Sequence, residues 1–184
     1  MGKNLEEKTI SVEKIFKGKV LDVEVHTVSL PNGETSKREL INHRGAVAIL
    51  ALTKDDEIIF VEQYRKAIEA VTLEIPAGKL EAGEDKKASA IRELQEETGY
   101  VVDESRLEKL CDVHVAVGYS SELITIYYVD KLEYAGEQSP DEDEFINLKK
   151  YKLQDAFRLL DNNEITDSKT MLALAYLKTR KGKD

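Results

Sequence analysis

The segment from Gly78 to Tyr100, GKLEAGEDKKASAIRELQEETGY, limits what this chain can be more than any other part of it. Its second half carries Glu93, Glu96 and Glu97, which stand at positions i, i+3 and i+4. On a helix, where successive residues turn by about 100°, these positions share one face. Because like charges at this spacing repel one another, carboxylates gathered in this way indicate a bound divalent cation.

The same segment predicts an amphipathic helix from about Asp85 to Thr98, with Gly99 as its C-terminal cap. Ile91 and Leu94 point away from the glutamates and can pack against a sheet. Ligands that are all oxygen favour Mg²⁺ or Mn²⁺. The alternative is that a glutamate-rich helix is only a solvated surface, as most charge runs are.

Composition narrows the class of protein. A chain of 184 residues with 41% hydrophobic and 34% charged residues predicts one soluble, globular catalytic domain rather than a disordered chain. The net charge of −9 argues against broad nucleic-acid binding, which depends on Lys and Arg. Cys111 is the only cysteine, and the three histidines are scattered, so neither an intrachain disulfide nor a zinc site is expected. The sequence shows no signal peptide and no apolar stretch of membrane-spanning length, so we expect a cytoplasmic protein with no membrane association.

Hydrophobic patterning around this segment predicts a mixed α/β fold. Residues 9–42 form an antiparallel strand meander with a turn at Pro31-Asn32-Gly33, and residues 46–52 and 57–64 form a second hairpin. Further strands are predicted at 71–75, 107–117 and 123–134, and helices at 152–163 and 167–181. Pro76-Ala77-Gly78 is expected to end the strand at 71–75 before a loop leads to the helix.

The order of residues from Gly78 resembles the Nudix box. Five residues lead to Glu84, seven more lead to Arg92-Glu93, and the segment closes on Gly99 and the bulky Tyr100, where aliphatic residues are more usual. The resemblance implies a Nudix hydrolase with the Nudix fold, an α/β/α sandwich around a mixed sheet with an N-terminal antiparallel β extension. We therefore assign residues 1–43 to a β meander that serves as a dimerisation element, and residues 44–184 to the Nudix hydrolase domain.

The resemblance also assigns roles within the box. Glu93, Glu96 and Glu97 correspond to the metal-binding carboxylates, and the backbone carbonyl of Ala77 to a further metal ligand. Metal ions can neutralise a pyrophosphate and lower the pKa of a bound water, after which a carboxylate must take the proton. Glu97 is one candidate for that base, and no organic cofactor is expected.

Four further box residues are expected to support this arrangement without binding metal. Glu84 and Arg92 match the pair that braces the box loop against the helix. Gly78 and Gly99 match the two glycines of the motif.

Similarity to the ADP-ribose pyrophosphatase group extends beyond the box. It rests on TSKREL, GAVAIL, VEQYRKA, LEIPAGKLEAGE and DSKTMLALAY. The resemblance implies hydrolysis of ADP-ribose to AMP and ribose 5-phosphate, in a homodimer whose partner subunit contributes to substrate binding. Arg65 matches an arginine that this group places near the substrate, where a guanidinium can bind phosphate through two hydrogen bonds. Arg38 is a similar candidate that could act across the dimer.

The loop VGYSSE corresponds to a Pro-Gly loop of that group, which is followed by a glutamate that binds metal or activates water. Glu122 matches this glutamate, and Gly118 is a candidate substrate contact. Val117 replaces the proline, which leaves the backbone of the loop freer and the identity of the sugar open. The acidic run at 140–144 is interpreted as a solvated loop without a role.

Two other functions compete with this one. The first is a Nudix hydrolase for a different nucleoside diphosphate derivative, such as a GDP-sugar, NADH or a diadenosine compound. The second is a Nudix-like ligand sensor that has lost catalysis. Such sensors usually lack the full carboxylate set and carry a DNA-binding helix pair, whereas this chain keeps the carboxylates and shows no basic domain.

Overall fold

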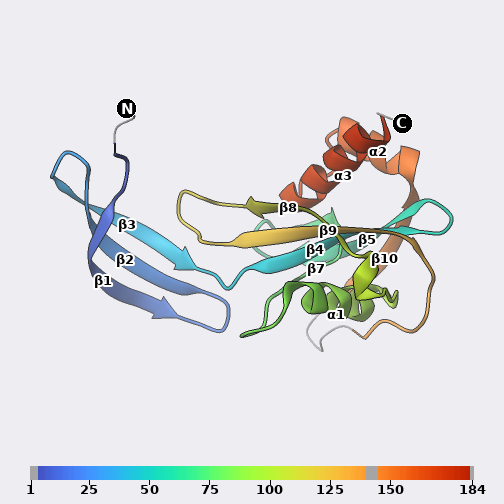
Figure 1. Ribbon diagram of the computed structural model, residues 1–184, viewed down its shortest axis with the longest axis horizontal. Helices are drawn as coiled ribbons and strands as arrows, with labels where there is room; N and C mark the ends of the chain where they lie inside the picture. The colour runs from blue at the N-terminus through green and yellow to red at the C-terminus, as the bar shows by residue number, and fades with distance from the viewer. Residues whose placement is uncertain (1–3, 140–144, 183–184) are drawn as a thin grey trace. The chain divides into compact units, whose positions relative to one another are not determined.

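The computed structural model describes residues 4–139 and 145–182 of the chain (Figure 1). They divide into two compact units. The first unit contains the chain up to Arg44 together with His114–Leu123, and the second contains Gly45–Val113 and the chain from Ile124 onward. Residues 114–123 thus group with the N-terminal strands, which the sequence-based division at residue 43 does not anticipate.

The first unit is built on a three-stranded antiparallel sheet of order β1-β2-β3. Its strands are β1 (Lys8–Lys17), β2 (Asp22–Ser29) and β3 (Thr35–Asn42). The β2–β3 turn closes with a 2.9 Å hydrogen bond from the Gly33 amide to the Leu30 carbonyl. Gly33 adopts a φ of 87°, which a residue without a Cβ tolerates best. All ten residues of β1 are exposed.

The second unit is built on a mixed sheet. Its strands are β4 (Ala46–Thr53), β5 (Glu57–Arg65), β6 (Ala70–Glu74), β7 (Ala77–Lys79), β8 (Glu108–His114), β9 (Leu123–Leu132) and β10 (Ile146–Lys152). The order is β10-β5-β4-β9-β8, with β6 paired to β5 and β7 paired to β4. Strands β4 and β9 run parallel, whereas β10, β6 and β4 are antiparallel to β5. Strand β4 is buried along its whole length, which explains why its sequence is apolar from Ala46 to Leu52.

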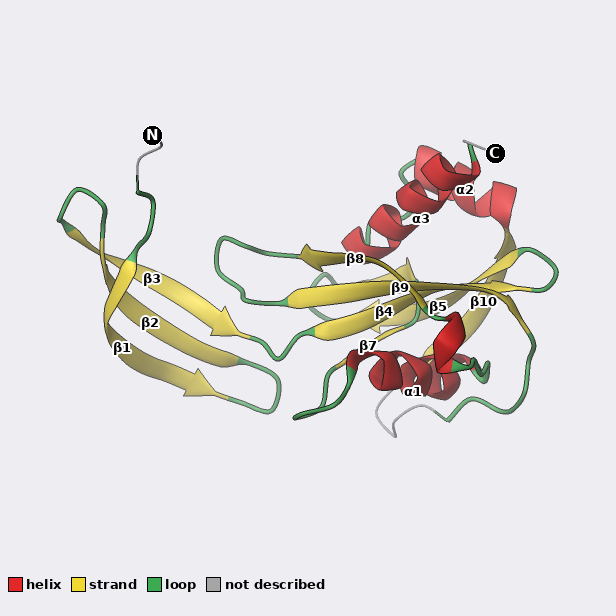
Figure 2. Ribbon diagram, viewed as in Figure 1, coloured by secondary structure: helices red, strands yellow, loops and turns green. Residues whose placement is uncertain are grey.

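Helices cover both faces of this sheet (Figure 2). Helix α1 (Lys86–Thr98) lies on one face, and α2 (Leu153–Asp161) and α3 (Ser168–Lys181) lie on the other. The core under α1 joins Ala90 and Leu94 to Val47 and Ile49 of β4, and all four residues are fully buried. The α/β/α sandwich predicted from the sequence is therefore confirmed.

Two strands of this sheet are absent from the sequence-based prediction. Strand β7 lies where Pro76-Ala77-Gly78 was expected only to end a strand, yet Ala77 and Gly78 pair with β4. Strand β10, INLKKYK, alternates weakly and carries three lysines, a composition typical of an edge strand. Strands this short or this polar are specified by their partners rather than by their own periodicity.

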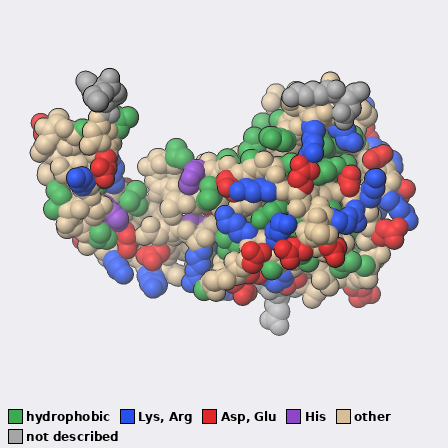
Figure 3. Space-filling model, in the orientation of Figure 1, with side chains coloured by type: hydrophobic (Ala, Val, Ile, Leu, Met, Phe, Trp, Pro, Cys, Tyr) green, Lys and Arg blue, Asp and Glu red, His purple; other side chains and the backbone are tan. Residues whose placement is uncertain are grey.

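The surface of the second unit carries charges of both signs. On the face shown in Figure 3, acidic and basic side chains intermingle, as expected when Asp and Glu number 36 and Lys and Arg number 27. Within residues 4–139 and 145–182, no helix is long and apolar enough to cross a membrane.

Candidate active site

Helix α1 begins and ends where its capping residues require. The Asp85 carboxylate accepts hydrogen bonds from the amides of Lys87 and Ala88, which would otherwise lack partners in the first turn. Gly99 ends the helix in the left-handed conformation, with a φ of 73° and its amide bonded to the Gln95 carbonyl. A Cβ on Gly99 would also lie 2.4 Å from the carbonyl oxygen of Gly136, so both its conformation and its surroundings favour glycine.

Glu97 projects from α1 into the sheet and is only 2% exposed. One carboxylate oxygen accepts a 3.1 Å hydrogen bond from the Gln63 side chain of β5, and the other accepts a 3.0 Å bond from the Ala77 amide of β7. The box helix and two strands therefore meet at this carboxylate. The residue whose carbonyl is a predicted metal ligand, Ala77, is therefore hydrogen bonded to Glu97 through its amide.

Glu93 lies against the backbone of Gly78. A Cβ built on Gly78 would stand 1.8 Å from the carboxyl carbon of Glu93 and 1.9 Å from one of its oxygens. No side chain can occupy position 78 unless the Glu93 carboxylate moves. The first glycine of the box is thus required by a close approach across the loop.

If Glu93 binds a divalent cation as predicted, replacing Gly78 with alanine should displace Glu93 and raise the Mg²⁺ concentration needed for half-maximal activity by about tenfold. A titration of activity with Mg²⁺ measures this, and circular dichroism verifies that the fold is retained. Gly136→Ala is the matched control, because nothing lies within 4 Å of a Cβ at that position. An unchanged Mg²⁺ requirement in Gly78→Ala would remove Glu93 from the proposed metal ligands.

Arg92 links the loop before α1 to two of the glutamates on the helix. Its Nε and Nη2 atoms donate to the two oxygens of Glu84, at 3.0 and 3.1 Å. Its Nη1 atom lies 2.9 Å from an oxygen of Glu93 and 2.9 Å from one of Glu96. The hydrogen bond from Arg92 is the main cause that lowers the pKa of Glu84 to about 2. Arg92 and Glu84 therefore stay charged and join the loop to the helix.

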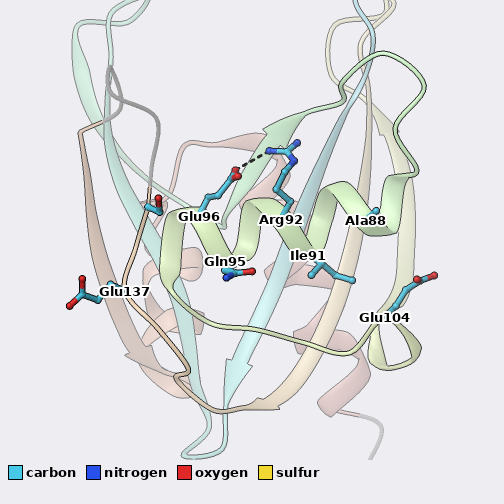
Figure 4. A pocket seen from close by; sticks show the side chains of 8 residues that line it. Ala88, Ile91, Arg92, Gln95, Glu96, Glu104 and Glu137 are labelled. Carbon is cyan, nitrogen blue, oxygen red and sulfur yellow. Dashed lines mark hydrogen bonds and ion pairs between the residues drawn. The ribbon is translucent and has the colours of Figure 1, made fainter.

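Glu96 occupies a more open environment than Glu97, with 39% of its side chain exposed. Figure 4 shows Glu96 beside Arg92 along one edge of α1, next to a depression of about 550 Å³. Glu104 and Glu137 also line this depression. The three glutamates predicted to bind metal thus have distinct surroundings, although they come from one helix.

The chemistry of these side chains fits a hard divalent cation, because their ligand atoms are all carboxylate oxygens. Among the described residues, no three His, Cys, Asp or Glu side chains are arranged as a preformed metal site. Instead, Glu97 accepts protein hydrogen bonds, and Glu93 and Glu96 contact Arg92. Because an ionised carboxylate has about four acceptor sites, these contacts leave oxygen lone pairs that a cation could bind.

Arg65 lies at the end of β5, where it makes a two-point ion pair with Glu74. Its Nε and Nη2 atoms each donate to a different oxygen of Glu74 at 2.7 Å. These hydrogen bonds raise the pKa of Arg65, and the negative charges of Glu74, Glu97 and Asp167 raise it further. Glu74 has no role in the sequence-based prediction, although it stands in the LEIPAG stretch that resembles the ADP-ribose pyrophosphatase group.

The remaining predicted site residues belong to the first unit. Arg38 of β3 donates two hydrogen bonds to Glu7, at 2.8 and 2.6 Å. A carboxylate oxygen of Glu122 lies 3.7 Å from Nδ1 of His43. Gly118 borders open space, and the acidic run at 140–144 lies outside the described residues. The roles assigned to Arg38, Glu122 and Gly118 stay predictions.

An α/β/α sandwich that holds a carboxylate-bearing loop and helix against its sheet is the framework of a hydrolase of the Nudix class. The NUDIX domain family matches residues 42–174, which is more than half of the chain. The chain belongs to this family and is a Nudix hydrolase.

Similarity to individual relatives extends over nearly the whole chain. The chain is 45% identical to an ADP-ribose pyrophosphatase of Bacillus subtilis, over 97% of its own length and 96% of the relative's. It is 46% identical to a methanol dehydrogenase activator of Bacillus methanolicus, over 96% and 95%. A crystal structure of an ADP compounds hydrolase matches 99% of this chain and 98% of its own, with 25% identity and a TM-score of 0.85.

Proposed function

We propose that this enzyme hydrolyses the pyrophosphate bond of ADP-ribose to give AMP and ribose 5-phosphate, with Mg²⁺ or Mn²⁺ as cofactor. The observation that carries the proposal is the 45% identity to an ADP-ribose pyrophosphatase over almost the full length of both chains. It is supported by the position of Arg65 on β5, where Arg65 pairs with Glu74 at two points and lies on the same face of the strand as Gln63, which donates to Glu97. Phosphate oxygens are the ligands that such a guanidinium binds best.

In this proposal the residues of the second unit divide the work. Glu93, Glu96 and Glu97, together with the carbonyl of Ala77, would hold the cation. When bound, the cation neutralises phosphate charge and makes a bound water more acidic. Arg65 binds a phosphate oxygen and orients the pyrophosphate.

The remaining roles concern the box geometry and the proton. Arg92 pairs with Glu84 and so keeps the box loop in place against α1. The proton of the attacking water passes to a carboxylate, and the candidates are Glu97 and Glu122.

We propose further that the enzyme is a cytoplasmic homodimer assembled through its N-terminal sheet. Strand β1 pairs with β2, and its Ile10, Val12, Ile15 and Phe16 side chains are 47–58% exposed. A run of apolar side chains on an edge strand favours association with another chain. In such a dimer, Arg38 and Gly118 would bind the substrate, with Arg38 acting across the subunit boundary.

A panel of nucleoside diphosphate derivatives, assayed with Mg²⁺ and separated by chromatography, tests the substrate. ADP-ribose should give AMP and ribose 5-phosphate with the highest kcat/KM, ahead of a GDP-sugar, NADH and a diadenosine compound. Omitting the metal should abolish turnover. If another compound exceeds ADP-ribose by more than about tenfold, or ~1.4 kcal/mol of transition-state preference, the ADP-ribose assignment fails while the family stands.

The similarity to a methanol dehydrogenase activator provides a second candidate function, activation of such a dehydrogenase. The two candidates are compatible, since both relatives match this chain over nearly its full length. Adding the purified enzyme to methanol dehydrogenase and following methanol oxidation examines this candidate directly.

A further inference from the structure

Glu74 is a buried carboxylate at the end of β6 with cationic partners on two sides. Glu74 is only 3% exposed. Arg65 contacts both of its oxygens from β5, and Lys169, near the start of α3, contacts one of them. The Thr72 hydroxyl donates to the oxygen that also receives Arg65 Nε, at 2.5 Å. Burial would raise the pKa of Glu74, but the hydrogen bonds from Arg65 and the charge of Lys169 outweigh it and lower the pKa to about 2.

Lys169 is itself buried, at 7% exposure, which is unusual for a lysine and requires compensation. Besides Glu74, its Nζ atom lies 3.0 Å from an oxygen of Asp167, the residue that caps α3. The other oxygen of Asp167 accepts hydrogen bonds from the amide and hydroxyl of Thr170. The Thr170 hydroxyl in turn accepts a 2.8 Å bond from the amide of Ile75, which follows Glu74. The carboxylate is thus tied to α3 through both its side chain and its neighbouring backbone.

Arg65 differs from Lys169 in being partly open to solvent, with 46% of its side chain exposed. Glu74 occupies its Nε and Nη2 atoms, and Nη1 makes no hydrogen bond to any described residue. Because a guanidinium is planar, two bonds to one carboxylate fix the direction of its remaining N–H groups. Arg65 is therefore oriented before any ligand arrives, and preorganised groups bind with a smaller entropy cost.

We infer that Glu74 is a positioning residue, which fixes the Arg65 guanidinium to receive a pyrophosphate oxygen, and that Lys169 is the buried counter-ion that holds Glu74 in place. This inference rests on the proposed function, in which Arg65 binds the substrate. Neither residue touches the reacting atoms in this scheme. Their effect on the substrate passes entirely through Arg65.

A double-mutant cycle separates this role from a general effect on folding. Glu74→Gln keeps the size of the side chain but removes its charge, and should raise KM for ADP-ribose about tenfold while kcat changes less than threefold. Lys169→Met should also raise KM for ADP-ribose, as Glu74→Gln does. Arg65→Lys keeps the charge but loses the planar two-point geometry, and should also raise KM about tenfold. When combined with Arg65→Lys, neither Glu74→Gln nor Lys169→Met should raise KM by more than about twofold.

A binding measurement keeps the inference independent of the substrate assignment. Calorimetric titration with inorganic pyrophosphate in Mg²⁺ uses the group that all nucleoside diphosphate derivatives share. The Kd for inorganic pyrophosphate should rise about tenfold in Glu74→Gln, even if ADP-ribose proves not to be the best substrate. Failure of the substrate panel would then count against the proposed function alone.

Glu57→Gln is the matched control, because Glu57 stands at the other end of β5 and pairs with Lys152 at 3.1 Å. It should leave KM and pyrophosphate affinity within twofold of wild type. If Glu74→Gln does not fold, Thr72→Val serves in its place, because it removes one hydrogen bond from the same carboxylate. It should raise KM about threefold in the presence of Arg65 and leave KM unchanged in the Arg65→Lys background. A wild-type KM in the folded Glu74 or Thr72 variant would overturn the inference. So would a rise in KM in the Arg65→Lys background as large as the rise in the presence of Arg65.

Discussion

Replacing Glu97 with glutamine is expected to lower kcat by about 100-fold or more while the protein stays folded. The substitution keeps the size of the side chain and can keep an acceptor for the Ala77 amide, so the junction of α1 with β7 should survive. It removes the negative charge that a cation or a proton acceptor needs. Steady-state kinetics with saturating Mg²⁺, together with a thermal unfolding curve, measure both parts of this result.

Glu81→Gln is the control for this substitution, because Glu81 lies in the same box loop but is exposed. Its kcat should stay within twofold of wild type. Wild-type turnover in a folded Glu97→Gln variant would contradict the assignment of Glu97 to the metal and to proton transfer.

Replacing Glu122 with glutamine should lower kcat by about 100-fold with little change in KM, if Glu122 holds a metal or takes the proton from water. Its carboxylate lies 3.7 Å from His43 and is only partly exposed, so the neutral side chain should fit the same space. The measurement is a comparison of kcat and KM for ADP-ribose at a fixed Mg²⁺ concentration.

The first unit offers a matched control for Glu122 in Glu24, which contacts His26 at 3.0 Å and has no proposed role. Glu24→Gln should retain turnover within twofold of wild type. A similarly small effect in Glu122→Gln would return the base to the box helix, with Glu97 as the remaining candidate.

Much of the fold could be predicted because its signals are local. Asp85 and Gly99 mark the ends of α1, and Asp167 marks the start of α3, each through bonds to the adjacent backbone. The strands with strong apolar patterns, such as β4 and β5, were predicted within one residue of their observed bounds. Strands β7 and β10 were missed because their pairing depends on partners distant in sequence.

The candidate site, like the fold, was predictable from the sequence only where its signals are local. The sequence brought Glu93, Glu96 and Glu97 onto one helix, because their spacing alone decides that they share a face. It could not indicate that Arg65 is held by Glu74, or that Lys169 is buried. Glu74 and Lys169 are 95 positions apart and meet only because α3 packs against the sheet beside β6.

By itself, the sequence determined the class of protein, since a long motif with fixed spacing encodes both the helix and its row of carboxylates. The tertiary structure alone decided how those carboxylates differ. Glu97 is buried where α1 packs against the sheet, and it accepts hydrogen bonds there from Gln63 and Ala77, which are 34 and 20 positions away from it in the chain. Glu96, one residue earlier, points to the open edge beside Arg92. Burial depends on what packs against a residue, and local spacing does not contain that information.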